Sequence, residues 1–372
     1  MSHSLLRSLR TLRGNARGCV LTEPLWGIPY NLWAPYASIY MLALGLSDSQ
    51  VGMVISLSLT GQTAMALISG VITDKMGRKR ATLVFDILAW SVPCLLWASA
   101  RSLEWFVVAG LVNSLRRVPD IAWSCLLVED TDPEDLTHVY ALAYMAGQLA
   151  VFLTPLAGLL IARLTLVPAV RWLYLLSFAM MTAKFVILNG MVTETRQGVR
   201  RLAETRSRPW LALLGEYRGV ARLMLANRRT LLTVSLMVVL SIVTMVQSTF
   251  WAVIVTERLH IPAAHIALFP FVRSLVMLAI LYLVVPRLRS ISFARPMALA
   301  LAGYVASQLV LISTPERGYA WLVLSTLLES GSYAVVATQT DRLTAINVDP
   351  QERARIIAVA HLTVIACTTP FG

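Results

Sequence analysis

The sequence predicts an all-α polytopic membrane protein. Of its 372 residues, 57% are hydrophobic and only 14% are charged, whereas roughly a quarter of the residues of a soluble protein are charged. The mean hydropathy is +0.68. A membrane-spanning helix needs about 20 mostly apolar residues, and eleven segments qualify. These approximate spans are 20–44, 51–73, 81–99, 104–127, 138–161, 171–190, 230–255, 263–286, 294–312, 319–341 and 352–372.

The basic residues orient these spans. Of the 32 Lys and Arg residues, 23 lie in the tail and connections on one side, 5 on the other, and 4 within spans. Because connections rich in Lys and Arg stay in the cytoplasm, we expect a cytoplasmic N-terminus and a multi-pass protein of the cell membrane. This distribution also accounts for the net charge of +12, so a nucleic-acid partner is not expected.

The chain offers no obvious catalytic or metal-binding pattern. Its four cysteines, Cys19, Cys94, Cys125 and Cys367, are widely separated and form no C-x-x-C pair, which argues against a disulfide framework or a metal site. No phosphate-binding loop, activated nucleophile or paired catalytic carboxylates are evident. We therefore expect neither an enzyme nor a bound cofactor, and a monomer within the lipid bilayer.

A dense polar segment, residues 70–80, joins the second and third spans. Gly70 lets two helices approach closely, Asp74 places a carboxylate at a helix end, and Gly77 permits a sharp reversal before a basic cluster. An ordinary positive loop that contains two glycines is the alternative interpretation.

The segment resembles the G-x-x-x-D-[RK]-x-G-R-[RK] signature between helices 2 and 3 of the major facilitator superfamily, and every fixed position matches. The resemblance implies two parallel-related bundles of six helices and alternating access around a midplane site. It also implies a latch, with Asp74 near the start of helix 11 around Gln351 and Arg78 near acidic residues at the end of helix 4. The implied gating residues are Gly70, Asp74, Lys75, Gly77, Arg78, Lys79, Glu129 and Asp130.

The predicted organisation follows this resemblance. We expect a tail at 1–19, a bundle at 20–190, a cytoplasmic linker at 191–229 and a second bundle at 230–372. Within the linker, residues 209–227 show the spacing of a basic amphipathic helix, although a partly disordered linker stays an alternative.

An internal repeat relates span 11 to span 5. Asp132-Pro133 precedes span 5, which reaches Thr154-Pro155, and Asp349-Pro350 precedes span 11, which reaches Thr369-Pro370. The sequence ends before a counterpart of span 6, so we expect eleven of twelve helices and a fragment or truncated product.

Charged residues within spans mark candidate cavity positions, because placing a charge in the hydrocarbon costs about 2.5–3.5 kcal/mol. In span 4, Arg116 and Asp120 share a stripe and either face the cavity or form a structural pair. In span 10, Glu329 either binds a cationic group or proton, or pairs with Arg273 of span 8. Asp86 is expected to pair with the basic cluster.

Two further residues have simple interpretations from the sequence. Lys184 is expected to extend towards the cytoplasmic interface. His361 is either a proton relay or a packing residue.

In the superfamily that the chain resembles, spans 1, 4, 7 and 10 line the central cavity. The resulting cavity candidates are Asn31, Asn113, Arg116, Asp120, Gln247, Arg273, Glu329, Tyr333 and His361. A span 4 arginine is associated with proton coupling in that family, although Pro119 and Asp120 depart from its R-x-x-Q-G-x-G motif.

The function implied is secondary transport of a small organic solute, with protons as the coupling ion. Gly147, Pro155 and Gly158 preserve part of the span 5 motif of superfamily exporters, whereas Thr154 replaces one glycine. This favours proton-coupled efflux. Uptake by symport, a non-transporting membrane sensor or scaffold, and an inactive truncated product stay as alternatives.

Overall fold

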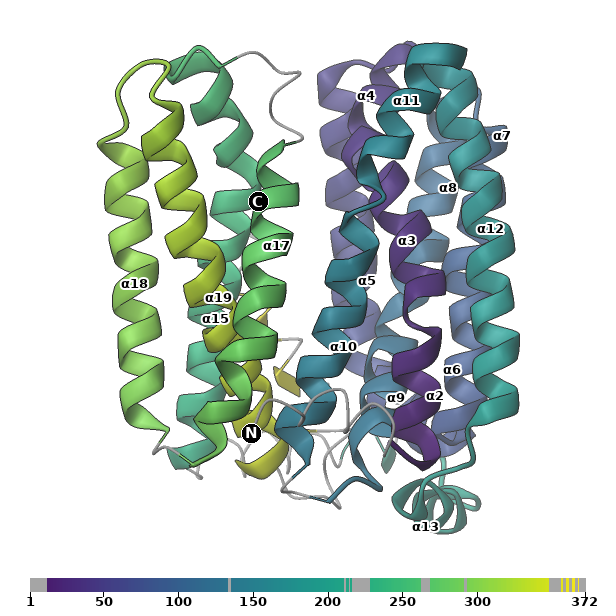
Figure 1. Cartoon of the computed structure of the whole chain (residues 1–372). Helices are drawn as coiled ribbons and strands as arrows, with labels where there is room; N and C mark the ends of the chain where they lie inside the picture. Colours follow the sequence, from purple (N-terminus) through teal and green to yellow (C-terminus); the bar gives the residue numbers. More distant parts are fainter. Residues whose placement is uncertain are drawn as a thin grey trace.

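The computed structural model describes residues 12–132, 135–210, 212–213, 215, 228–261, 268–290, 293–347, 356, 359–360, 363–364 and 367. Within these residues every regular element is a helix, as the sequence predicts. Figure 1 shows two groups of upright helices side by side, with a short helix below one of them.

The first helical group runs from α2 to α12. It contains α2 (Gly14–Thr22), α3 (Pro24–Trp33), η1 (Ala34–Tyr36), α4 (Ala37–Ala43), α5 (Asp48–Met76), α6 (Arg78–Asp86), η2 (Ile87–Ser91), α7 (Val92–Ser99), α8 (Leu103–Asn113), η3 (Ser114–Arg116), α9 (Arg117–Val128), α10 (Leu136–Val151), α11 (Thr154–Leu164) and α12 (Leu166–Met191).

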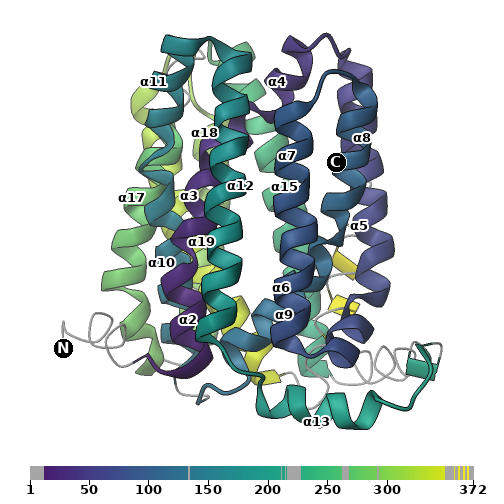
Figure 2. The ribbon, with the colours of Figure 1, turned by 90° about the vertical axis from the view of Figure 1, so that its right-hand side faces the viewer.

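The second helical group follows α13 (Arg196–Thr205), which lies across the end of the first group in Figure 2. This group contains α15 (Arg228–Val253), η4 (Ile254–Arg258), α17 (Leu268–Leu283), η5 (Val285–Ser290), α18 (Ala294–Ile312) and α19 (Tyr319–Asn347). We refer below to the α13 end and the opposite end of the molecule.

Large apolar side chains cover the outside of both groups. Leu159, Trp172 and Leu299 are 63%, 62% and 74% exposed, which suits lipid better than water. Within the described residues, five helical segments are long and apolar enough to cross a membrane: Asp48–Met76, Arg78–Ser99, Leu166–Met191, Ala294–Ile312 and Tyr319–Leu343. The larger number of eleven spans stays a prediction.

Proline accounts for several interruptions of the other predicted spans. Because proline lacks an N–H group and its ring crowds the preceding turn, a continuous helix is difficult to maintain around it. Segment 20–44 passes through the 3₁₀ turn η1, which contains Pro35. Segment 104–127 is interrupted at η3, three residues before Pro119, and α11 restarts with Pro155 in its first turn. These breaks leave helices shorter than a full span.

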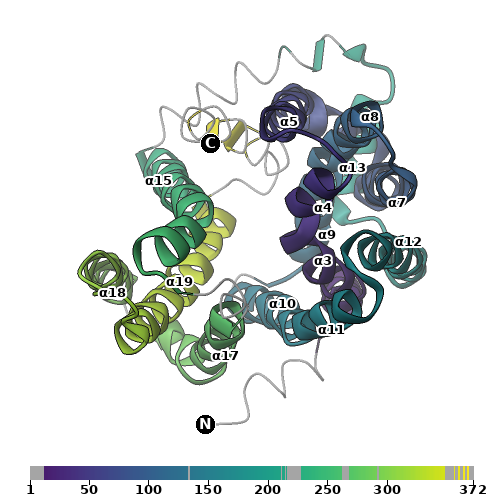
Figure 3. The same cartoon turned by 90° about the horizontal axis from the view of Figure 1, so that it is seen from above.

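The described contacts between the two groups involve α10, which packs against α17 and α19. The view from above places α10 beside α17 at the junction (Figure 3). One apolar cluster near the α13 end includes Leu142 of α10, Leu281 of α17 and Val336 of α19. Tyr144 of α10 also donates a hydrogen bond to Asp341 Oδ2 of α19 over 2.7 Å. The two groups are thus joined by a partly buried polar contact as well as by apolar packing.

Candidate functional site

A sharp reversal at Gly77 separates α5 from α6. Its φ of +82° lies in the region that favours glycine, and an added Cβ would lie 2.5 Å from Glu194 Oε2. Glu194 uses its two carboxylate oxygens to accept the backbone N–H groups of Arg78 and Lys79, at 2.8 and 3.0 Å. A carboxylate thus caps the first turn of α6, where free N–H groups and the helix dipole favour negative charge.

The Arg78 side chain is only 1% exposed and lies between two carboxylates. Its Nη1 is 3.1 Å from Asp74 Oδ1, and its Nε is 3.1 Å from Glu129 Oε2. A second hydrogen bond, from Nη2 to Glu129 Oε1 over 3.2 Å, makes the Glu129 pair bidentate. Thr195 also donates to Glu129. The expected proximity of Arg78 to acidic residues at the end of span 4 is therefore confirmed.

Helix α13 docks directly on this charged network. Arg201 Nη2 is 3.1 Å from Asp74 Oδ2, and Arg201 Nη1 is 2.6 Å from Glu204 Oε2. Burial lowers the pKa of the Arg201 guanidinium, but the Asp74 and Glu204 carboxylates more than offset this and raise it overall. Lys75 Nζ donates to the carbonyl oxygen of Arg208 over 2.6 Å. The linker helix and the 70–80 segment therefore form one charged cluster.

The sequence did not reveal this partnership. The predicted linker helix, 209–227, lies mostly outside the described residues, whereas α13 occupies an earlier part of the linker. The expected contact of Asp74 with the start of span 11 near Gln351 also lies outside them. Asp130 does take part, since its Oδ1 accepts the backbone N–H of Arg196 over 3.3 Å. Gly70 is buried within α5.

We expect Arg201→Gln to loosen α13, because the Asp74 carboxylate loses a charged partner worth about 1.5–3 kcal/mol. Amide hydrogen exchange over residues 196–205 is then expected to accelerate about tenfold, the equivalent of 1.4 kcal/mol. Arg200→Gln is the matched control, since Arg200 is half exposed and contacts only Glu204 in the described residues. Equal exchange in the two variants would contradict the docking.

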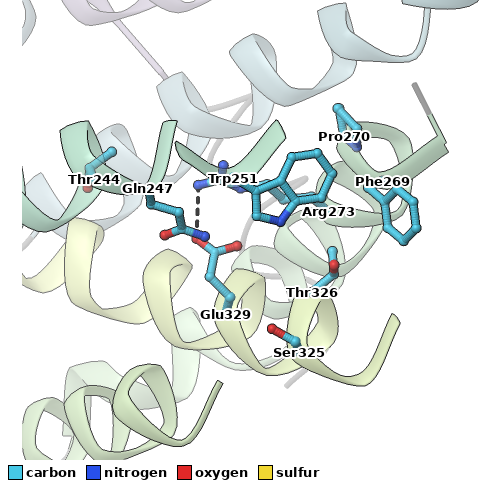
Figure 4. A pocket seen from close by; sticks show the side chains of 9 residues that line it. All are labelled: Thr244, Gln247, Trp251, Phe269, Pro270, Arg273, Ser325, Thr326 and Glu329. Carbon is cyan, nitrogen blue, oxygen red and sulfur yellow. Dashed lines mark ion pairs between the residues drawn. The ribbon is translucent and has the colours of Figure 1, made fainter. Parts of the chain in front are cut away.

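A cavity of about 160 Å³ lies between α15, α17 and α19. Arg273 Nη2 is 3.1 Å from Glu329 Oε1 across it (Figure 4). The Glu329 side chain is 4% exposed and that of Arg273 is 37% exposed, so the carboxylate is buried and the guanidinium is partly accessible. The residues that line the cavity are Thr244, Gln247, Trp251, Phe269, Pro270, Arg273, Ser325, Thr326 and Glu329.

This cavity brings together several residues expected from the sequence. The Arg273–Glu329 pair, one of the two alternatives for Glu329, is present. The Tyr333 ring lies 5.3 Å from the Arg273 guanidinium, and Tyr304 donates a hydrogen bond to Gln247. Tyr333 also lines an adjacent cavity of about 410 Å³ that contains Tyr144 and Asp341, neither of which the sequence analysis singled out.

A third cavity, of about 280 Å³, lies within the first helical group and combines acidic and aromatic side chains. Lys184 Nζ is 3.0 Å from Glu23 Oε2, and the lysine side chain is 6% exposed. The expectation that Lys184 extends towards the interface is therefore wrong, because Glu23 provides a buried counter-ion. The lining residues are Glu23, Trp26, Asp86, Trp90, Pro119, Asp120, Trp123, Ser124 and Lys184.

The expected partner of Asp86 also differs. Asp86 is 6% exposed and faces this interior cavity instead of the basic cluster. Helix α6 carries it about two turns further along than the cluster at its start. Sequence proximity alone was therefore a poor guide to its surroundings.

The polar residues of span 4 pair differently from the prediction. Asp120 Oδ2 is 3.2 Å from Arg117 Nη1, so the ion pair of Asp120 is with Arg117 and not with Arg116, the partner in one of the two alternatives from the sequence. Arg116 and Arg117 both donate to Gln62 Oε1, at 2.9 and 2.7 Å. Arg117 and Asp120 both lie in the first turn of α9, three residues apart, where side chains of an α-helix are neighbours.

Two predicted asparagines bond to backbone carbonyls. Asn113 donates to Ala89 over 2.8 Å and Asn31 donates to Gly27 over 2.7 Å. The carbonyl group of Ala89 lies in the π-helix η2, and that of Gly27 lies two residues before Pro29 in α3. The remaining candidate, His361, lies outside the described residues.

Comparisons with known proteins agree with this architecture. The chain is 30% identical over 192 residues to an uncharacterized MFS-type transporter, YqjV, of Bacillus subtilis (strain 168). That match covers 49% of the chain and 47% of YqjV, so the chain spans about half the length of this curated relative.

Solved structures resemble nearly the whole chain. The human organic anion transporter MFSD10 (TETRAN) has a TM-score of 0.69 and 16% identity, covering 99% of this chain and 92% of its own. A bacterial homologue of the iron transporter ferroportin has a TM-score of 0.72 and 12% identity, covering 97% and 91%. The proton:xylose symporter XylE has a TM-score of 0.72 and 12% identity, covering 95% and 86%. At such identities the likeness shows the fold.

The Major Facilitator Superfamily model matches residues 27–366. Because this match takes in nearly the whole chain, the protein belongs to the Major Facilitator Superfamily.

Proposed function

We propose that the protein is a secondary transporter that exports a small organic solute in exchange for protons. Residues 20–190 and 230–372 are the two halves that move against each other, and residues 191–229 connect them. The observation that carries this proposal is the Arg273–Glu329 pair, which faces a cavity inside a superfamily fold.

The Glu329 carboxylate is suited to the exchange of a proton for a solute. Proton antiport requires that proton and solute occupy the carrier alternately, and one carboxylate can bind either a proton or a donor group of the solute. Arg273 stabilises the charged carboxylate between these events, since an unpaired charge in this environment would be costly. Trp251 and Phe269 supply apolar walls for the body of the solute.

The charged cluster at the α13 end supplies a gate. Asp74, Arg78 and Glu129 lie at the end where α10, α17 and α19 pack together. We place this end in the cytoplasm because the predicted charge asymmetry puts the basic residues there. Breaking and reforming such buried pairs would bias the two conformations that alternating access requires.

The proposed direction of transport, export, is inferred from the span 5 residues that match the exporter motif. Gly147 lies in α10, and Pro155 and Gly158 lie in the first turns of α11, so the pattern occupies the break between these helices. A break of this kind next to the junction with α17 gives the second half of the span freedom to tilt.

Uptake by proton symport is the second candidate. The observation that favours it is the likeness to XylE, described as a proton:xylose symporter. The same carboxylate would then be protonated when the solute binds, so the two mechanisms differ in the relative direction of proton and solute.

Proteoliposomes separate the two candidates. Vesicles that enclose a pH-sensitive dye, at equal pH on both sides, are exposed to external organic cations, organic anions or sugars. Exchange predicts that an entering solute drives protons out and the lumen becomes alkaline, whereas symport acidifies it. Protein-free vesicles are the control. Solute entry without a pH change would contradict proton coupling, and no entry across the panel would contradict transport by the purified chain.

A further inference from the structure

We propose that the cavity within the first helical group binds an organic ammonium ion, with Asp86 as the carboxylate that pairs with it. The site shares no lining residue with the Arg273–Glu329 cavity, so it goes beyond the exchange proposed above. Its walls come from the α2–α3 junction, α6, η2, α9 and α12.

The first argument is the imbalance of charge. Three carboxylates line the cavity, those of Glu23, Asp86 and Asp120, together with one ammonium group, that of Lys184. Lys184 pairs with Glu23 at 3.0 Å, and Asp120 pairs with Arg117 at 3.2 Å. Within the described residues no hydrogen bond or ion pair engages the Asp86 carboxylate.

The burial of Asp86 makes this lack of a partner significant. Asp86 is 94% buried, given its exposure of 6%, and it lines the cavity. A buried polar group without a partner is uncommon, since it costs free energy that a bound ligand can recover. Lys184 attracts the Asp86 carboxylate but forms its ion pair with Glu23, so Asp86 can still accept a direct hydrogen bond from a cationic ligand.

The second argument is the aromatic lining. Trp26, Trp90 and Trp123 all line the cavity, and Trp26 meets Trp90 edge to face at 5.2 Å between ring centroids. Aromatic faces attract cations, and groups of them recognise organic ammonium ions. An organic cation gains from both the rings and the carboxylate.

Lys184 already shows that this lining accepts an ammonium group. Its Nζ lies 5.8 Å from the Trp26 ring, 5.6 Å from the Trp123 ring and 5.9 Å from the Phe185 ring. The same nitrogen pairs with Glu23. A second ammonium beside Asp86 would reproduce this combination of one carboxylate and several ring faces.

The cavity is large enough for a small organic ion. Its volume is about 280 Å³, whereas one water needs only about 10–15 Å³ on this measure. The π-helix η2 follows Asp86 directly and contains Trp90. Asp86 and Trp90 are four residues apart, so they lie on the same helical face, and both line the cavity.

The Trp123 indole adds a feature that concerns the rest of the ligand. Its Nε1 is buried and has no hydrogen-bond partner within the described residues. A ligand that carries an acceptor, such as a hydroxyl or ether oxygen, would satisfy this donor. The expected class is therefore an organic ammonium compound, with an added acceptor strengthening the binding.

Thermal unfolding of the purified full chain tests the site. The probe is n-butylammonium chloride, which copies the end of a lysine side chain, and the controls are 1-butanol and sodium chloride. A ligand at free concentration L that binds only the folded state stabilises it by RT ln(1 + L/Kd), so the dependence of Tm on ligand concentration gives the Kd. We expect the Kd of n-butylammonium to be at least about tenfold below that of 1-butanol, the equivalent of 1.4 kcal/mol.

Variants locate the binding. Asp86→Asn is expected to raise the Kd of n-butylammonium at least about tenfold, while Glu316→Gln, the same kind of change at an exposed position, leaves it unchanged. Glu329→Gln is measured as well, to show whether n-butylammonium binds in the Arg273–Glu329 cavity instead. Trp26→Phe, which keeps a ring but weakens its attraction for cations, is expected to raise the Kd several-fold. Monodisperse elution and a single cooperative unfolding transition without ligand show that each variant is folded, and each variant's Tm shift is measured from its own ligand-free Tm.

Three results would overturn the proposal. They are equal responses to n-butylammonium and 1-butanol, undiminished binding in both Asp86→Asn and Trp26→Phe, or loss of binding in Glu329→Gln alone. Because the assay uses detergent-solubilised protein and needs no proton gradient, failure of transport in vesicles would leave its outcome intact.

Discussion

Arg78→Ala is expected to destabilise the purified protein by about 3–5 kcal/mol, the usual result of removing one partner from a buried ion pair. Arg78 is 1% exposed and contacts both Asp74 and Glu129. Without it, the bidentate partner of Glu129 is lost, and Asp74 loses one guanidinium partner while it keeps Arg201. The measurement is Tm and the denaturant midpoint of the detergent-solubilised protein.

Arg80→Ala provides a close control for this prediction. Arg80 lies two residues further along α6, is exposed, and carries the same charge. Its removal is expected to change stability by no more than about 0.5 kcal/mol, as for other surface positions. Equal losses of stability in Arg78→Ala and Arg80→Ala would show that stability depends on the net charge and not on the buried network.

Glu329→Gln is expected to reduce solute-driven proton movement at least about tenfold, the equivalent of losing 1.4 kcal/mol. Glutamine keeps the size of the side chain but cannot carry the proton, and it leaves Arg273 without its carboxylate. The initial rate of the luminal pH change in proteoliposomes measures the effect. A variant that still binds solute but no longer moves protons would assign the coupling to this carboxylate.

The exposed carboxylate of Glu316 serves as the comparison. Glu316 lies between α18 and α19 at the opposite end, so Glu316→Gln makes the same chemical change away from the cavity. The rate of solute-driven proton movement in Glu316→Gln is expected to match that of the unchanged protein. If Glu329→Gln also moves protons at the unchanged rate, Glu329 is only a structural partner of Arg273 and the proposed exchange mechanism is wrong.

The sequence predicted those features that local composition determines. Long apolar segments identify membrane helices because lipid requires them, and the 70–80 segment contains its own turn at Gly77. The sequence could also suggest the Arg273–Glu329 pair, because a charged side chain within an apolar span usually pairs with an opposite charge. The family followed from the same segment and is shown by the match over residues 27–366.

Long-range partners could not be predicted in the same way. Arg201 meets Asp74 and Glu194 caps α6 across more than 100 residues of sequence, and both lie in a linker whose polar composition suits any surface. Lys184 and Glu23 are similarly remote. Hydrophobic periodicity contains no information about which charged side chains meet when helices assemble.

Competition between neighbouring side chains was the second source of error. The sequence offered Arg116 as a partner for Asp120, but Arg117, three residues before Asp120 in α9, forms the ion pair. Arg116 and Arg117 both donate to Gln62 Oε1 of α5. The position of Gln62 beside these arginines depends on how two helices pack, which no single segment determines.

Spin labels at both ends of the molecule test the central claim, that the two helical groups move about a buried polar centre. Exposed positions are available at the α13 end, in Arg80 and Arg295, and at the opposite end, in Arg101 and Glu316. Cysteine pairs at 80 and 295, and at 101 and 316, would carry the labels. Exposed Cys367 is replaced by serine, and the remaining three native cysteines are buried.

Distances between these labels are then measured by electron paramagnetic resonance at high and low pH and with solute. Alternating access predicts that one end opens as the other closes, so the two distances change in opposite directions. Distances that stay constant at both ends, or that increase and decrease together, would contradict the account.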